Sequence, residues 1–461
     1  MTPTLAIIGA GFSGTLTAVH LLRRGRRLRV VLINRSGQMA RGVAYGTRTE
    51  AHVLNVPAGR MSAFPDDEES FLRFARKHDA SLSGASFVPR RLYGEYLEAL
   101  LAEAAANAPP GTALEQVVAS VKDIQLSPDG ASANLSLSDG RTLHADRVVL
   151  ALGNYAPADP RIKDPRFYES PRYVRDPWHP EALAGVPATE PVLLIGTGLT
   201  MLDVTLNLRA KGVRGKIHAL SRRGLLPQAH RASSAPPKHD HLPPGLLAGP
   251  RSTRAYLRAV RAYVELMKQQ GTDWRDVIAS LRPVTPALWE GLSTQERARF
   301  LRHVRPYWEV HRHRAAPELL AALSAELDSG MLTVHPGRLV ALEEARGAVL
   351  ATMQPRGSAK AVQFEVSTVI NCTGPESDTR TMREPLISAL RARGLLVPDP
   401  LGLGVETAPN LALLNAQGGA SQALFYVGPY LKARYWEATA VPELRQHALK
   451  VADGLLASLP R

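Results

Sequence analysis

The stretch LAIIGAGFSG at residues 5–14 decides the fold of this chain. Its first four residues are apolar, as in a buried parallel strand, and residues 15–22 after it are predicted to form a helix. In this spacing Gly9 makes a tight turn, Gly11 lets the backbone approach a pyrophosphate, and Gly14 lets the helix pack closely on its strand. A second strand at residues 29–33 completes a βαβ unit. The context therefore favours a dinucleotide-binding turn over a glycine turn without a ligand.

A second turn of the same kind, GTGLT at residues 196–200, follows the apolar run VLLI at residues 192–195. A predicted helix at 201–209 and a predicted strand at 217–220 complete the second unit. Two units of this kind predict two bound dinucleotides. The second strand ends in Ser221-Arg222-Arg223, and a pair of arginines suits a 2′-phosphate because guanidinium is a permanently charged fork of donors. We therefore expect NADP rather than NAD, and a solvated arginine pair is the alternative.

The first unit departs from the usual pattern at the end of its second strand. Asn34 and Arg35 stand where an acidic residue usually accepts a ribose hydroxyl. The carboxamide of asparagine still accepts a hydrogen bond. Adenosine binding at this strand end therefore remains the expectation.

Composition excludes several classes of protein. The single cysteine, Cys372, rules out an internal disulfide and a CxxC redox pair, and it is expected to be a buried small residue in a strand. The net charge of +14 would suit nucleic-acid binding, but the arginines are spread over all 461 residues and form no known nucleic-acid module. No signal peptide or membrane span is predicted. We expect a cytoplasmic protein without nucleic-acid or membrane partners.

The order of predicted elements indicates an α/β fold of two Rossmann-like dinucleotide-binding domains with a helical insertion. Residues 1–156 and 376–461 are expected to form the first domain, and residues 157–375 the second, with the helical insert at about 231–330. Further helices are predicted at 66–78, 92–106, 251–269, 294–304 and 317–327, and one from about residue 437. Further strands are predicted at 114–126, 133–137, 142–150, 332–335, 339–343, 348–353, 363–365, 367–370 and 424–428.

Several distant motifs, taken together, resemble the two-dinucleotide-binding flavoproteins, and among them a bacterial group of FAD/NAD(P)-binding proteins. The motifs are the turn at 9–14, LNVP with RM at 54–61, PR with YG at 89–94, ALGN at 151–154, RPYW with HRHR at 305–314, and GP with WEATAVPE at 428–443. The resemblance implies FAD in the first domain and NADPH in the second.

In relatives of this architecture the C-terminal segment contributes to the isoalloxazine site. The resemblance therefore places Gly428 and Pro429 near the ribityl chain, and a helix from near Trp436 and Glu437 with its positive end toward the flavin. Many related folds have an Asp where this chain has Pro429, and a core aromatic is the alternative role for Trp436. The residues expected to bind the cofactors are Gly9, Gly11, Phe12, Ser13, Gly14, Asn34, Arg35, Asn55, Val56, Met61, Gly153, Gly196, Gly198, Leu199, Thr200, Arg222, Arg223, Gly374, Gly428, Pro429, Trp436 and Glu437.

The loop at residues 52–61 resembles the segment beside the flavin ring in flavin monooxygenases. Asn55 is the candidate catalytic residue, since its carboxamide can hydrogen-bond flavin or nicotinamide, and a turn asparagine before Pro57 is the alternative.

Arg305, Arg312 and Arg314 form a dense cationic cluster in the expected insert, suited to binding a carboxylate or phosphate of the substrate. Binding of NADP and structural ion pairs are the alternatives. The two histidines at 311 and 313 have only Glu309 as a nearby carboxylate, so no metal site is expected.

FAD and NADPH in one chain imply hydride transfer to flavin, and without a dithiol the flavin must pass its electrons directly to another molecule. The glycine turns, with Asp176-Pro177-Trp178-His179 ahead of the second, resemble the single-component flavin monooxygenases that hydroxylate amines. We therefore expect hydroxylation of a nitrogen of a small anionic amine or amino acid, with dioxygen, through a flavin hydroperoxide. An NADPH-dependent reductase or dehydrogenase of an organic or protein acceptor is the first alternative. A non-catalytic flavin redox sensor is the second.

Overall fold

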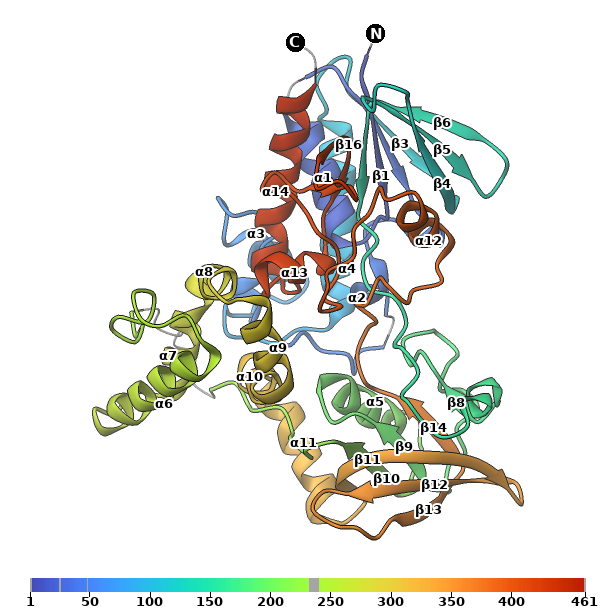
Figure 1. Ribbon diagram of the computed structural model, residues 1–461, viewed down its shortest axis with the longest axis vertical. Coiled ribbons are helices and arrows are strands. Elements are labelled where there is room, and N and C mark those ends of the chain that lie inside the picture. Colours follow the sequence, from blue (N-terminus) through green and yellow to red (C-terminus); the bar gives the residue numbers. More distant parts are fainter. Residues whose placement is uncertain (1, 25, 48, 232–239, 460–461) are drawn as a thin grey trace.

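A computed structural model describes residues 2–24, 26–47, 49–231 and 240–459. It contains two α/β regions, one at the top of Figure 1, where both termini lie, and one at the bottom. Each region is built on one main β-sheet, and a group of yellow-green helices lies at the left of the view. The α/β fold with two Rossmann-like domains and a helical insertion, predicted from the sequence, is confirmed.

The first sheet has six strands in the order β15-β16-β7-β1-β2-β3. All neighbours pair in parallel except β15 and β16, which are antiparallel. The central strands β1 and β7 are buried along their whole length, as their continuous apolar sequences predict. The strands are β1 (Thr4–Ile8), β2 (Arg29–Ile33), β3 (Ala113–Val117), β7 (Arg147–Leu150), β15 (Ala412–Leu414) and β16 (Ala420–Tyr426). The C-terminal part of the chain thus completes the sheet that the N-terminal part begins.

Helices pack beside the first sheet around α1 (Phe12–Arg23), which contacts α4 (Arg90–Ala106) and α14 (Val441–Ser458). Two short helices, α2 (Gly42–Tyr45) and α3 (Ser70–Arg76), contact α4 in turn. A small sheet of β4 (Val121–Leu126), β5 (Ala133–Leu137) and β6 (Thr142–Ala145) lies at the right of Figure 1, where β4 contacts α12 (Pro385–Ala392). The largest apolar core fills the space between the main sheet and its helices.

The second sheet has seven strands in the order β13-β12-β11-β10-β9-β14-β8. The five strands from β11 to β8 are parallel, and β12 and β13 continue the sheet antiparallel. Two helices that contact each other, α5 (Leu199–Ala210) and α11 (Pro317–Asp328), pack on it. The strands are β8 (Tyr173–Val174), β9 (Val192–Ile195), β10 (Ile217–Ser221), β11 (Leu332–Ala345), β12 (Ala348–Pro355), β13 (Val362–Val366) and β14 (Thr368–Asn371).

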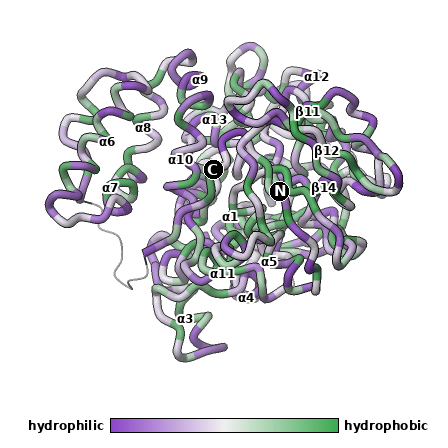
Figure 2. The backbone as a smooth tube through the Cα atoms, turned by 90° about the horizontal axis from the view of Figure 1, so that it is seen from below, coloured by the Kyte–Doolittle hydropathy of each residue, from purple (hydrophilic) through white to green (hydrophobic). Residues whose placement is uncertain are grey.

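Five helices between β10 and α11 form the helical insert: α6 (Thr253–Gln269), α7 (Trp274–Leu281), α8 (Thr285–Glu290), α9 (Thr294–His303) and α10 (Arg305–Arg312). Figure 2 shows α6, α7 and α8 set to one side of the molecule. The side chains of Ser252, Asp273 and Ser293 cap α6, α7 and α9 by accepting a backbone N–H of the first turn. The two ends of the insert meet, because Gln228 and His230 exchange backbone hydrogen bonds with Ala315. We call this meeting point, residues 228–231 and 312–316, the neck.

The structure differs from the sequence prediction at four places. The predicted strand at 114–126 is two strands, β3 and β4, that belong to different sheets, and the predicted strand at 142–150 is likewise divided into β6 and β7. The two predicted strands at 332–335 and 339–343 are one strand, β11, with an irregularity in its pairing between Leu339 and Ala341. The helix predicted from about residue 437 begins at Val441, because Trp436 has a positive φ of 60° and ends the short helix α13 (Lys432–Tyr435).

Among the residues that the structure describes, no helix combines the length and the apolar character that a membrane crossing requires.

Candidate functional site

The first glycine turn has the geometry that a diphosphate cradle needs. Gly9 has a φ of +107°, and a Cβ atom added there would lie 2.2 Å from the carbonyl oxygen of Ala151. A Cβ on Gly14 would lie 1.9 Å from the oxygen of Gly9, so α1 packs against the turn as only glycine allows. Gly11 precedes α1 and makes no side-chain cap. The N–H groups of Phe12 and Ser13, in the first turn, are therefore left for an anion.

The loop after β2 crosses in front of this turn. Gly42 has a φ of +60°, and a Cβ there would lie 2.9 Å from the Cα atom of Gly11. Gly42 was not among the residues predicted to bind a cofactor. The sequence signal that could have identified Gly42 was its position in a glycine-rich loop.

Asn34 and Arg35, at the end of β2, are already engaged. The amide nitrogen of Asn34 donates to the hydroxyl of Ser36 (3.0 Å) and to the carbonyl oxygen of Gln38 (2.7 Å). Both bonds use Nδ2, so the carboxamide oxygen is the atom that Asn34 can offer to a ribose hydroxyl. Arg35 reaches Glu384 at 3.6 Å and is largely exposed.

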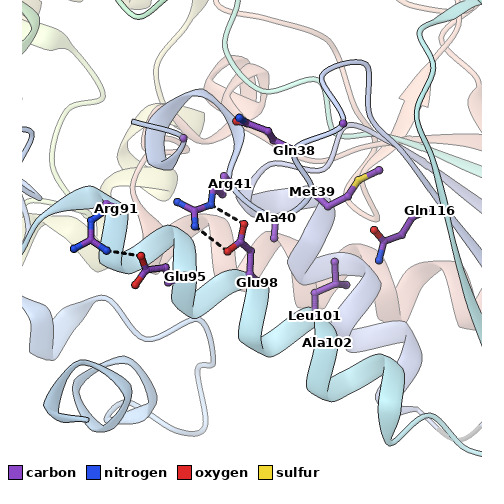
Figure 3. Close-up of a pocket in the computed structure, with 12 residues that line it drawn as sticks. Gln38, Met39, Ala40, Arg41, Arg91, Glu95, Glu98, Leu101, Ala102 and Gln116 are labelled. Atoms are coloured by element: carbon purple, nitrogen blue, oxygen red, sulfur yellow. Dashed lines mark hydrogen bonds and ion pairs between the residues drawn. The ribbon is translucent and has the colours of Figure 1, made fainter. Parts of the chain in front are cut away.

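A cavity of about 740 Å³ lies between the loop at residues 37–41 and α4 (Figure 3). Arg41 binds Glu98 through two hydrogen bonds of 2.6 and 2.9 Å, and Arg91 pairs with Glu95. Among the described residues that line the cavity, the two arginines therefore neutralise the charges of the two glutamates. The cavity suits a ligand group that is polar but uncharged.

The second glycine turn repeats the first. Gly196 has a φ of +114°, and a Cβ there would lie 2.4 Å from the carbonyl oxygen of Cys372. Gly198 precedes α5 without a side-chain cap, and a Cβ there would meet no atom within 4 Å. Gly153 and Gly374, at the ends of β7 and β14, also have positive φ and open space in front of them. Leu199 and Thr200, which open α5, are partly exposed. Both turns thus fit the diphosphate of a dinucleotide.

The two arginines after β10 have different surroundings. Arg223 donates to the hydroxyl of Tyr307 (3.1 Å) and to the carbonyl oxygen of Arg302 (3.2 Å), so it binds the insert. Arg222 is exposed, and the described residues give it no ion pair. Of the two predicted ligands of a 2′-phosphate, Arg222 is the one whose guanidinium faces solvent.

The loop at residues 52–61 lies against the neck. The carbonyl oxygen of Asn55 accepts a hydrogen bond of 2.9 Å from Nε2 of His230. Burial and, to a lesser extent, the charge of Arg314 lower the pKa of His230 to about 4, although the bond to Asn55 opposes them. Val56 packs on the first core and Met61 is buried in it. Asn55, Val56 and Met61 are the residues of this loop that were predicted to bind a cofactor, and of these three Asn55 has the polar side chain.

A buried ion pair joins the two domains. Arg90, in the first turn of α4, pairs with Asp203 of α5 at 2.7 Å, and the two side chains are 15% and 5% exposed. The guanidinium of Arg90 lies 5.2 Å from the ring centroid of Trp178, which also contacts the ring of His52. Burial raises the pKa of Asp203, while Arg90 opposes the rise. Trp178, singled out by the resemblance to amine-hydroxylating enzymes, thus packs at the domain junction.

The three arginines expected to act as one cluster are not together. Arg305 begins α10, is about half exposed and pairs with Glu309 at 3.4 Å. Arg312, at the end of α10, lies 3.3 Å from Glu437, and its side chain is 12% exposed. Arg314 follows the helix, is 6% exposed, and its Nε and Nη1 atoms have no hydrogen-bond partner. Arg305 thus lies about two turns of α10 from Arg312, and the described electrostatic contacts bring together Arg312 and Arg314.

The C-terminal segment is built differently from the expectation. Gly428, with a φ of +134°, precedes a 3₁₀ turn that starts at Pro429. Trp436 is buried against Trp289 and Phe300 of the insert, as its alternative role of core aromatic predicts. Glu437 is buried too and accepts a hydrogen bond of 2.9 Å from the indole of Trp308. The placement of a helix N-terminus at these residues was wrong, because α14 begins beyond them.

Comparisons with known proteins agree with this geometry. Residues 6–155 match a family described as FAD-NAD(P)-binding. Nitrosuccinic acid synthase of Aspergillus oryzae is 26% identical over 279 aligned positions, which cover 52% of this chain and 43% of that enzyme. The chain thus spans less than half the length of this relative. A protein of Mycobacterium tuberculosis described as uncharacterized is 23% identical over 99% of this chain and 95% of its own length.

Among solved structures, L-lysine 6-monooxygenase from Pseudomonas syringae superposes with a TM-score of 0.66 at 14% identity, with all of both chains covered. This chain has the fold of the flavin-dependent N-hydroxylating monooxygenases. The resemblance predicted from the sequence is confirmed, and the matched family indicates FAD and NAD(P) as cofactors.

In this flavoprotein fold, Cys372 is buried at the end of β14, and burial raises the pKa of its thiol. The chain has no second cysteine to form a dithiol. Within the described ranges, no group of three or more His, Cys, Asp or Glu side chains is placed to hold a metal ion.

Proposed function

We propose that this chain is an FAD-dependent, NADPH-reduced monooxygenase that hydroxylates a nitrogen of a small anionic amine, such as an amino acid. The observation that carries the proposal is the pairing of two diphosphate cradles, at Gly9 and Gly196, in the fold of the N-hydroxylating monooxygenases. An enzyme that uses a cofactor for the difficult chemistry needs its own residues chiefly to bind, orient and exclude water.

The first cradle would hold FAD and the second NADPH. Gly11 and Gly14, with Gly428 of the C-terminal segment, are the glycines that suit the FAD diphosphate and ribityl chain. Gly198 suits the NADPH diphosphate, and Arg222 suits its 2′-phosphate. FAD, when bound, supplies a carrier that accepts a hydride from NADPH and then reacts with dioxygen.

The chain's own residues would orient and shield the reacting groups. Asn55 lies in the loop that contacts the neck, and we propose that its carboxamide hydrogen-bonds the flavin or the nicotinamide. The buried aromatic group of Trp289, Phe300 and Trp436 closes the contact between the insert and the C-terminal segment. This apolar closure would keep bulk water away from the reaction.

The anionic substrate is supported by the charge of the insert. Arg314 is buried and Arg312 is largely buried next to the loop that carries Asn55 and Arg60, and a cationic site selects an anion. The name of the relative nitrosuccinic acid synthase denotes an acid product.

Anaerobic and aerobic turnover test the proposal. NADPH is expected to bleach the bound flavin in anaerobic stopped-flow measurements, and faster than NADH. With an amino acid substrate and air, NADPH oxidation is expected to yield an N-hydroxylated product. Turnover of an electron acceptor at the same rate without oxygen would instead support a reductase. Bound FAD that neither nicotinamide reduces would support a redox sensor.

A further inference from the structure

Arg314 is a buried cation for which the described residues show no ion pair; its guanidinium lies 5.8 Å from the ring centroid of Trp274. Arg314 lies in the neck of the insert, just after α10 and next to Ala315, which pairs with Gln228. Its side chain is nine-tenths buried, and both Nε and Nη1 lack a hydrogen-bond partner. Buried charges in proteins are normally paired, because an unpaired one loses its hydration without compensation. Among the described residues, Nε and Nη1 of Arg314 are therefore left to a further hydrogen-bond acceptor.

The neighbouring charges make the site more cationic. Arg312, Arg275 and Arg60 all act on Arg314, and together with burial they lower its pKa to about 10. Burial is the largest cause, and the only carboxylate among the causes, Asp273, is the last. A guanidinium whose positive charge is disfavoured by its surroundings attracts an anion.

The nearby carboxylates already bind other arginines. Asp273 accepts from Arg275 at 3.3 Å, and Glu443 binds Arg282 through two hydrogen bonds. Glu437 accepts from the indole of Trp308 and pairs with Arg312. Among the described residues, no carboxylate reaches Arg314.

The site lies against the loop at residues 52–61 rather than at the second diphosphate cradle. His230 of the neck donates to the carbonyl oxygen of Asn55, and Arg60 belongs to the same loop as Asn55. The second cradle is linked to the other end of α10, where Arg223 contacts Tyr307. A helix of eight residues such as α10 is about 12 Å long, so Arg314 is separated from that contact.

We propose that Arg314 binds a carboxylate group of the substrate, with Arg60 and Arg275 beside it. This inference rests on the proposed function, and it assigns the substrate to amines that carry a carboxylate. The fork of guanidinium donors matches the two carboxylate oxygens. Arg312 is a positioning residue, because Glu437 and Glu443 already hold it. A phosphate group of NADPH has the same chemistry and is the competing occupant.

Succinate is a suitable probe, because it has carboxylates but no nitrogen to hydroxylate. Isothermal titration of the FAD-loaded protein with succinate is expected to show saturable binding at constant ionic strength, and no binding of neutral succinamide. Arg314→Gln is expected to weaken succinate binding at least tenfold, with the Kd of NADPH unchanged within twofold. Arg305→Gln, at the start of α10 and paired with Glu309, is the matched control and is expected to stay within twofold of the wild type.

The inference would be overturned if the wild type showed no saturable succinate binding, or if Arg314→Gln bound succinate as tightly as the wild type. It would also be overturned if Arg314→Gln lost NADPH binding and kept succinate binding. Arg314→Lys is the second variant if Arg314→Gln fails to fold. It keeps the charge without the fork, so succinate binding is expected to fall between wild type and background. Equal binding by wild type and Arg314→Lys would also reject the site. Because succinate binding needs no turnover, this test is independent of the hydroxylation assay.

Discussion

Two buried arginines lie where the first domain meets the rest of the chain, and they differ in one respect. Arg90 has a carboxylate of the second domain 2.7 Å away, and its guanidinium stacks near Trp178. Arg314 is at least as buried but has two unpartnered nitrogen atoms. Burial and charge alone therefore do not distinguish a structural arginine from one that awaits a ligand. The presence of a protein carboxylate distinguishes them, so the same substitution should lower the stability of the fold much more at Arg90 than at Arg314.

Removing Arg90 should have the largest effect. Arg90→Met leaves the carboxylate of Asp203 buried without its partner, which costs about 3–5 kcal/mol of the free energy of unfolding. Urea denaturation followed by tryptophan fluorescence measures this, since Trp178 lies at the junction. A loss below about 1 kcal/mol would show that the pair does not hold the domains together.

His230 should make stability fall in mild acid. Its pKa is about 4 in the folded protein against about 6.5 when unfolded, so the folded state binds fewer protons between these values. Stability is therefore full above pH 6.5 and decreases as the pH falls toward 4, by up to about 1.4 kcal/mol per pH unit. The variant His230→Gln should show a shallower decrease in denaturation midpoints measured from pH 7 to pH 4. An identical profile would mean that this histidine is protonated in the folded state.

Arg222→Ala should reduce the preference for NADPH. One charge-assisted hydrogen bond to a phosphate is worth about 1.5 kcal/mol, or about tenfold in the KM for NADPH. The KM for NADH should not change, and Arg223→Ala, whose native side chain binds the insert, is the control. If Arg223→Ala alone changes the ratio of the two KM values, the roles of the two arginines are reversed.

Arg314→Met should have the smallest effect on stability. In the absence of a carboxylate, replacing an unpaired buried guanidinium by an apolar side chain should change the free energy of unfolding by less than about 1 kcal/mol. The same urea titration used for Arg90→Met gives the matched value. A loss as large as that of Arg90→Met would identify Arg314 as a structural residue.

Local sequence patterns predicted the parts of this molecule that depend on local geometry. Both glycine turns stand where apolar runs lead into helices, and positive φ at Gly9 and Gly196 follows from that arrangement. The pairing of Arg90 with Asp203 was not predictable, because it joins residues 113 positions apart that no local pattern connects. The three insert arginines looked alike in sequence. Whether each is buried depends on where α10 ends and on how the insert packs against the first domain.

The C-terminal error has a similar cause. Trp436 adopts a positive φ of 60°, which is rare for a bulky side chain, and tertiary packing against Trp289 holds it there. From helix propensity alone, the last helix was predicted to begin at about residue 437. In the structure it begins at Val441, because the packing of Trp436 interrupts the helix.

Oxygen labelling distinguishes a monooxygenase from a reductase or a redox sensor. The FAD-loaded protein, NADPH and a carboxylate-bearing amine are incubated under ¹⁸O₂, and the product is analysed by mass spectrometry. A monooxygenase is expected to give an N-hydroxylated product that contains one ¹⁸O atom, with one NADPH consumed per product. Continued NADPH consumption without oxygen, or a product free of ¹⁸O, would contradict the proposed function.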